Sequence, residues 1–225
     1  MKKLPFILVI LLIIPFVLGA APPGNATLSL NTRVNTIFLH GFFGPDIELS
    51  DYTEVTTLNV FDEFDDAGFF EDDVEYTDII GVIDNTLDYD DIPMFDFGEP
   101  SYEIGYYLFL SNEMGNYKVS FAISPFYSTK NSFTVPWTLQ VDYKGGNTDF
   151  TGSDDFESGG TFGFNGGTTG LSHPIFTTGA DKVHKFAALE LTMKPYFVGS
   201  DETNSAMIPA GDDYMATVVA SITSP

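Results

Sequence analysis

The chain contains no cysteine. It therefore has no disulfide framework, no thiol nucleophile and no cysteine that could carry a lipid after an export signal. A zinc site built from thiolates is excluded for the same reason. Exported eukaryotic β-sandwiches often use disulfides, so the absence of cysteine favours a bacterial protein.

Basic residues are scarce as well. Lysine and arginine number 9 against 32 aspartates and glutamates, which gives a formal net charge of −23 at pH 7. Between Val34 and Tyr117 there is no lysine or arginine. Such an acidic surface repels the phosphates of nucleic acids and anionic lipids, so we expect neither as a partner. It is compatible with cations, with basic proteins and with high solubility.

Motifs that carry catalysis are missing too. The three histidines, His40, His173 and His184, lie far apart without the spacing of a metal site, and His40 is expected in a turn before Gly41. There is no GxSxG nucleophile turn and no phosphate-binding glycine loop. Acid pairs are too numerous for any one pair to indicate a glycan hydrolase. We therefore predict that the protein is not an enzyme.

The sequence has only one long apolar run, which follows Lys2 and Lys3. Residues 1–20 read as a signal peptide, with a charged start, an apolar middle and small residues at the end. A retained membrane anchor is the alternative interpretation. No later run is long enough to cross a bilayer, so we predict no membrane span after signal removal. The mature protein, 21–225, is then secreted, to the periplasm or cell surface of a bacterium.

Aromatic residues, by contrast, are abundant at 15%, and 21 glycines and 13 prolines supply turns. Aromatic and β-branched residues in alternation are typical of half-buried strands. We predict an all-β fold, an Ig-like or pilin-like antiparallel β-sandwich in a single domain with long acidic and glycine-rich loops, one of them at 144–170. Strands are predicted at residues 53–61, 78–83, 102–110, 116–125, 133–143 and 185–198.

An extended segment, residues 26–39, follows the signal directly and alternates apolar with polar side chains. Leu28, Leu30 and Val34 lie on its apolar face. One interpretation is the protein's own first strand. The other is an inter-subunit strand that fills a groove in a neighbouring copy by β-augmentation.

A closing strand, residues 214–222, ends the chain after a Pro-Gly turn. It is expected to pair with strands formed much earlier and to provide the edge of the acceptor groove. One face of this strand carries Tyr214, Ala216, Val218, Ala220 and Ile222.

Acidic clusters are expected in solvated loops. Calcium needs several oxygen ligands held in one loop, so these residues also form a candidate metal site, although Phe64 and Ala67 break the EF-hand pattern. We predict no cofactor, with calcium as the one alternative. The candidate ligands are Asp62, Asp65, Asp66, Glu71, Asp72 and Asp73.

The sequence Pro-Ala-Gly-Asp-Asp-Tyr-Met-Ala-Thr-Val at 209–218 resembles the ending of bacterial pilin-like and spore-coat-type secreted β-sandwich proteins, and Phe-Asp-Phe-Gly at 95–98 resembles a motif after one of their early strands. This chain differs from them in lacking a cysteine pair and an aromatic residue near the terminus. The resemblance implies an exported, non-catalytic surface or fibre subunit with an Ig-like fold.

The expected function is therefore a structural subunit of a pilus, coat or fibre that associates with itself or with other surface subunits. The alternative is a secreted calcium- or carbohydrate-binding sandwich that uses the acidic loops, Trp137 or the glycine-rich loop.

Overall fold

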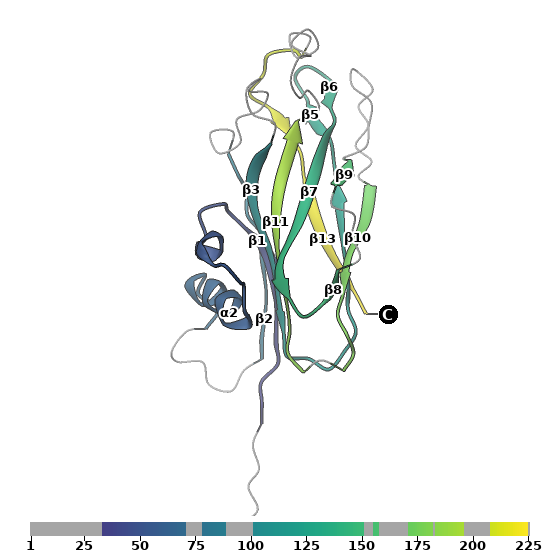
Figure 1. The fold of residues 1–225 in the computed structure, drawn as a ribbon. Helices are drawn as coiled ribbons and strands as arrows, with labels where there is room; N and C mark the ends of the chain where they lie inside the picture. The colour runs from purple at the N-terminus through teal and green to yellow at the C-terminus, as the bar shows by residue number, and fades with distance from the viewer. Residues whose placement is uncertain are drawn as a thin grey trace, which may run out of the picture. The chain divides into compact units, whose positions relative to one another are not determined.

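The computed structural model describes residues 33–70, 78–88, 101–150, 155–157, 171–181, 183–195 and 208–224 (Figure 1). The described residues from Asn35 onward belong to one compact unit, and the fold below is the fold of that unit.

The larger sheet has six strands in the order β2-β1-β3-β11-β7-β9. Its two central strands, β3 and β11, carry continuous apolar runs because both of their faces are buried. All neighbours pair antiparallel except β1 and β2, which are parallel. The strands are β1 (Ile37–Phe43), β2 (Ile79–Ile83), β3 (Tyr102–Ser111), β7 (Trp137–Gly146), β9 (Asp155–Glu157) and β11 (Lys185–Pro195).

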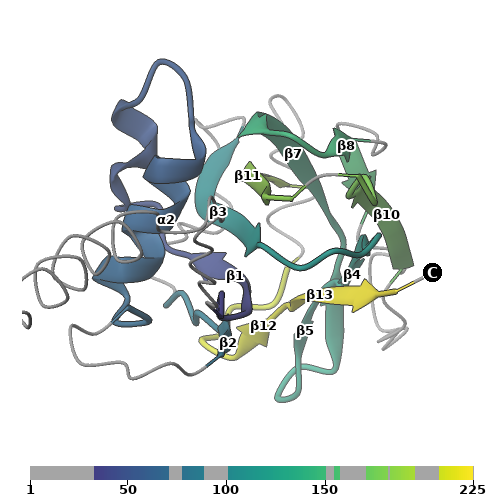
Figure 2. The same ribbon diagram turned by 90° about the horizontal axis from the view of Figure 1, so that it is seen from below.

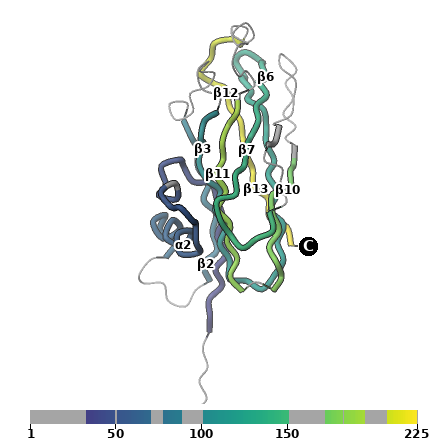
Figure 3. Tube along the Cα trace, in the orientation of Figure 1, coloured from purple at the N-terminus to yellow at the C-terminus, as the bar shows by residue number. Residues whose placement is uncertain are grey.

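Two smaller sheets complete the β-structure. One has the order β13-β4-β10-β8 and the other the order β12-β5-β6. The closing strand predicted over 214–222 is divided in the structure: residues 214–215 pair within the three-stranded sheet and residues 218–223 within the four-stranded one. Figure 3 shows the path of this closing segment along the chain. The strands are β4 (Lys118–Ile123), β5 (Phe126–Ser128), β6 (Phe133–Val135), β8 (Asp149–Phe150), β10 (Leu171–Thr177), β12 (Tyr214–Met215) and β13 (Val218–Thr223).

The main core lies between the six-stranded sheet and the smaller sheets. Phe109 of β3 packs edge-on against Phe176 of β10, and Tyr107 packs against Phe121 of β4. Trp137 belongs to this core, is 4% exposed, and donates a hydrogen bond from Nε1 to the Ser124 carbonyl at 2.7 Å. This arrangement confirms the all-β, sandwich-like class.

A helical layer covers part of the opposite face of the six-stranded sheet (Figure 2). It contains η1 (Glu48–Asp51) and α2 (Thr57–Asp66). Val60 and Phe64, four residues apart on α2, pack into a second core with Leu39 and Leu108.

The strand predicted at residues 53–61 is wrong, because α2 occupies much of that range. Thr56 caps the helix: its hydroxyl accepts from the Asn59 amide, and the Asn59 side chain accepts from the Thr56 amide at 2.8 Å. The loop expected at 144–170 is also partly wrong, because β7 continues to Gly146 and two short strands follow. The strands predicted at 78–83, 102–110 and 116–125 are confirmed with shifted ends, as is the one at 185–198 within its described part, 185–195. The strand predicted at 133–143 is divided into β6 and β7, which belong to different sheets.

The segment predicted as one strand over 26–39 is corrected where it is described. Residues 33–36 are not strand, and β1 begins at Ile37 and runs on to Phe43. His40 therefore lies within a strand rather than in a turn. The predicted signal peptide, Leu28 and Leu30 lie outside the described residues.

Helices are few in the described part of the chain, and none of them combines the length and apolar character needed to cross a membrane.

Candidate strand-addition site

The two facing sheets leave apolar side chains exposed on the β1 and β2 side. Ring contacts align them strand by strand: Phe109 of β3 meets Phe176 of β10, and Phe42 of β1 meets Phe121 of β4. The next strands outward are β2 in the large sheet and β13 in the small one. Both are terminal strands of their sheets among the described residues, and Figure 2 shows them at neighbouring borders.

Side-chain exposure rises steadily across this border. Phe109, His40 and Val82 form one row across β3, β1 and β2, because His40 is in register with both of the others. Phe109 is fully buried, His40 is half-buried and Val82 is 62% exposed. The gradient means that the side chains of this row are covered at β3 and remain in contact with water at β2.

A second row shows the same gradient. Ser111 of β3 is buried, Phe38 of β1 is half-buried and Ile80 of β2 is 67% exposed. We call these inward-facing side chains the open border; it consists of Phe38, His40, Phe42, Ile80 and Val82. Two exposed apolar side chains on one strand form a small patch that a further strand could cover.

The wall of the open border is the backbone of β13. Thr217, just before β13, is bonded to Ser124 before the β4–β5 turn: the Ser124 amide donates to the Thr217 carbonyl at 2.9 Å, and the Thr217 amide donates to Ser124 Oγ at 2.8 Å. Since hydrogen-bonded pairs alternate in an antiparallel ladder, the backbone groups of Val218, Ala220 and Ile222 point away from β4. No described strand pairs with that outer edge.

The side chains of the closing segment alternate between two environments. Those facing inward are half-buried against the main core, whereas outward-facing Met215 and Val219 are 71% and 52% exposed. The inward set consists of Tyr214, Ala216, Val218, Ala220 and Ile222.

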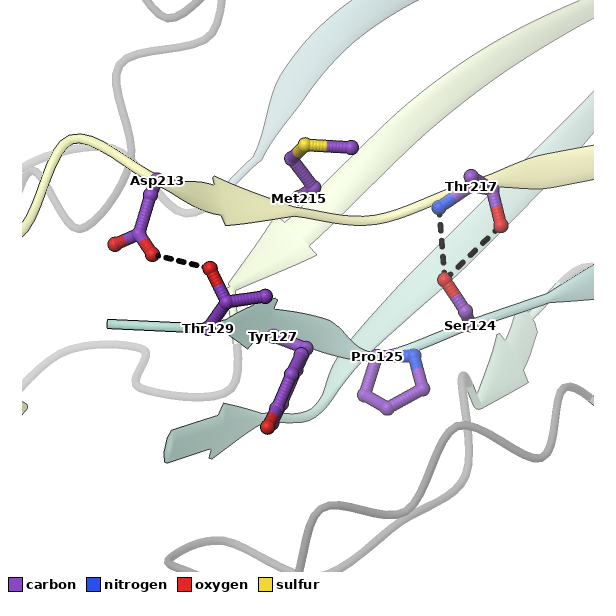
Figure 4. A pocket seen from close by; sticks show the side chains of 7 residues that line it. All are labelled: Ser124, Pro125, Tyr127, Thr129, Asp213, Met215 and Thr217. Atoms are coloured by element: carbon purple, nitrogen blue, oxygen red, sulfur yellow. Dashed lines mark hydrogen bonds between the residues drawn. The ribbon is translucent and has the colours of Figure 1, made fainter. Parts of the chain in front are cut away.

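The start of the closing segment is held by Asp213 (Figure 4). Its carboxylate accepts hydrogen bonds from Ser128 Oγ at 2.7 Å, Thr129 Oγ1 at 3.1 Å and the Lys130 amide at 2.8 Å. The bond from the Lys130 amide, followed by those from the hydroxyls, holds the pKa of Asp213 below its usual value. Lys130 also pairs with Asp212. These contacts fix β12 beside β5, and with it the direction in which β13 begins.

A hollow on the outer face lies next to this carboxylate (Figure 4). Its polar atoms already bond to one another, as Ser124 does with Thr217 and Asp213 with Thr129. Its remaining surface is made by Pro125, Tyr127 and Met215. The hollow therefore offers apolar contact and few unsatisfied polar groups to a ligand.

His40 is the polar member of the open border. Its Nδ1 lies 3.2 Å from the hydroxyl of Tyr107, which is fully buried. Burial lowers the pKa of His40 and raises the pKa of the Tyr107 phenol far above its usual value.

The candidate calcium ligands are not brought into one site by the described structure. Asp62, Asp65 and Asp66 are exposed on α2 rather than in a loop, while Glu71, Asp72 and Asp73 lie outside the described residues. Within the described ranges, no group of three or more acidic or histidine side chains is placed to hold a metal ion.

Glu63 differs from the other helix acids because it is buried. Burial, followed by the charges of Asp66 and Glu48, raises its pKa. Trp137 is buried as well, so it cannot stack on a sugar at the surface.

The segment that leads into β1 is pinned at its last residues. The Asn112 side chain accepts from the Ile37 amide and donates to the Asn35 carbonyl, both at 2.7 Å, and the Thr36 amide donates to Asp78 at 2.9 Å. Val34, just before them, is 78% exposed. These hydrogen bonds therefore hold the chain in place from Asn35 onward.

Ile80 and Val82 were missed as site residues by sequence reasoning. The run Ile-Ile-Gly-Val-Ile is apolar on both faces, which is also the pattern of a fully buried strand. Its position at the border of the sheet depends on pairing with β1, forty residues earlier, and no local signal reports it.

Comparison of the chain with protein-family models, with curated proteins and with solved structures finds no match.

Proposed function

We propose that the protein is an exported, non-catalytic structural subunit of a surface appendage or layer, pilus-, coat- or fibre-like, that assembles by strand addition. One copy supplies the segment before Asn35, and the open border of another copy receives it. The proposal is carried by two features at neighbouring sheet borders (Figure 2): the outer edge of β13, which no described strand pairs with, and the exposed side chains of Ile80 and Val82 on β2.

Strand addition at this edge would satisfy two needs together. The amide and carbonyl groups of Val218, Ala220 and Ile222 would gain partners from the added backbone. Its inward side chains would lie over β2 and remove Ile80 and Val82 from water. Edge strands that expose backbone groups next to apolar side chains are strong templates for pairing.

The sequence before β1 has the pattern such a donor needs. Leu28, Leu30 and Val34 occupy one face, on which positions two residues apart are about 7 Å from each other; Leu28 and Leu30 are successive positions, and Thr32 lies between Leu30 and Val34. The rows of the open border, at Phe38 and His40, repeat at the same two-residue spacing. Apolar side chains of the donor can therefore match successive rows.

A second copy is a better source of the donor than the same chain. The stretch 26–37 contains no glycine or proline, the residues that most readily reverse a chain. Asn35 to Ile37 are also held against Asn112 and Asp78 as the chain enters β1. A donor that continues without a tight turn reaches a neighbouring subunit.

The test compares the mass in solution of the chain starting at residue 21 with that of a chain starting at Arg33, which keeps the pinned residues. Light scattering should show oligomers for the first and monomers for the second. Leu28→Ser with Leu30→Ser should act like the deletion, and the matched control Thr27→Ala with Ser29→Ala, on the other face, should leave the oligomers intact. Monomers of the longer chain at high concentration, or oligomers that survive the deletion, would refute the proposal.

A further inference from the structure

His40 makes the open border sensitive to pH, which a border of apolar side chains alone would not be. We propose that the protonation state of His40 controls strand addition: the neutral imidazole permits the added strand, and the imidazolium opposes it. This inference rests on the proposed function, because it concerns the same border.

The hydrogen bond to Tyr107 favours the neutral ring. Among the described residues, His40 is the only hydrogen-bond partner of the Tyr107 hydroxyl. A neutral imidazole can accept the hydroxyl proton at Nδ1, whereas the imidazolium donates from both nitrogens. Protonation would therefore leave the hydroxyl hydrogen of a fully buried tyrosine without an acceptor, which is costly inside a protein.

Strand addition would strengthen this preference. His40 is half-buried because the row it shares with Phe109 and Val82 opens toward β2. A strand laid over β2 removes water from the exposed side of the ring, and loss of water disfavours the charged form. Burial already lowers the pKa of His40 in the uncovered state, and covering the border lowers it further.

Few charged groups oppose this effect. The ring has Phe38 beside it on β1, Tyr107 on β3 and Val82 in register on β2. At the Phe38 end, Tyr117 packs against Phe38, and its hydroxyl donates to Glu113. Burial is the cause that lowers the pKa of His40.

The sign of the pH dependence follows from linkage. Association releases a proton from His40, so the affinity between copies is highest when the ring is neutral and falls as the pH drops through its pKa. Since that pKa lies below the ordinary 6.5, the affinity should weaken by at most about tenfold between pH 7.5 and pH 5.5. Ordinary carboxylates stay ionised in this window, which keeps the net charge nearly constant.

The experiment measures the dissociation constant of the chain starting at residue 21 by sedimentation at pH 7.5 and 5.5. Association of the wild type should be weaker at pH 5.5 than at pH 7.5. His184→Gln, a matched change at an exposed histidine, should show the same loss of affinity at pH 5.5, whereas the affinity of His40→Gln should be the same at both pH values. A pH dependence that survives His40→Gln, or affinity that does not change in the wild type, would overturn the control by His40 and leave strand addition standing. No association at either pH would overturn both.

A second measurement does not depend on the variant folding. NMR titration of the His40 ring should give a lower pKa in the associated chain than in the chain starting at Arg33. Equal values in the two would also overturn the proposal.

Discussion

The exposed pair on β2 offers the sharpest test of the open border. We predict that replacing Ile80 and Val82 together by threonine weakens association strongly and leaves the fold of the single copy nearly unchanged. Threonine keeps the branched shape that suits a strand but places a hydroxyl where the added strand would pack.

The magnitude follows from how much of each side chain is still in water. Full burial of a valine or isoleucine side chain contributes about 1.5–3 kcal/mol. Ile80 and Val82 are 67% and 62% exposed, so roughly 1–2 kcal/mol each is still to be gained on association. The double variant should therefore lose about 2–4 kcal/mol, which raises the dissociation constant roughly 30- to 1,000-fold.

Sedimentation velocity over a concentration series gives this constant, and thermal unfolding of the chain starting at Arg33 gives the stability of the single copy. The unfolding free energy should change by no more than about 0.5 kcal/mol per site, as for surface positions in general.

Val219→Thr is the matched control, since Val219 is 52% exposed on the outward face of β13. Leu58→Thr tests the other side of the six-stranded sheet, where Leu58 is 72% exposed on α2. Unchanged association in the β2 double variant, or equal weakening by Val219→Thr, would refute the assignment of the open border.

Three further predictions concern stability. Asp213→Asn should lower the melting temperature. The wild type should lose stability as the pH falls through the depressed pKa of Asp213, and the variant should not show this loss; an unchanged acid melting profile would contradict the role of Asp213 in holding β12. Glu63→Gln should stabilise the protein at pH 7, because the raised pKa of Glu63 means that its ionised form costs stability once the pH exceeds that pKa; urea unfolding at pH 5 and 7 should show the gain shrinking at the lower pH. Gly81→Ala should destabilise by about 1–3 kcal/mol in urea unfolding, since its new methyl group would lie 2.0 Å from Phe69 Cε1, and no loss would show that the Phe69 ring moves aside freely.

The strands could be predicted where one face of the strand is buried and the other faces water, because the sequence then alternates. Residues 214–222 alternate in sequence, and their side chains alternate between core and solvent in the structure. The helix α2 was missed because its aromatic and β-branched residues favoured a strand, whereas the capping pair Thr56 and Asn59 and the spacing of Val60 and Phe64 were the stronger signals.

The candidate site could be predicted only in part, for a physical reason. The pattern of the closing segment gives the face of each side chain, but its status as an edge depends on pairing with β4, about a hundred residues earlier. The exposure of Val82 depends on where the opposite sheet stops, which no local sequence records. His40 was placed in a turn because Gly41 follows it, yet that glycine serves a close approach: a methyl group there would lie 2.4 Å from the Ile83 carbonyl oxygen.

If copies assemble as proposed, the anchoring of β1 has a mechanical consequence. A pull on the residues before Asn35 acts along β1, which is bonded to β2 on one side and β3 on the other and is held at its start by Asn112. Such a load must shear two ladders of hydrogen bonds at once. The same tension reaches the receiving copy through β13, which in the described structure is bonded to β4 alone. Under increasing force, each subunit should therefore yield first at its receiving edge, and the strand that it donates should stay attached to its own sheet.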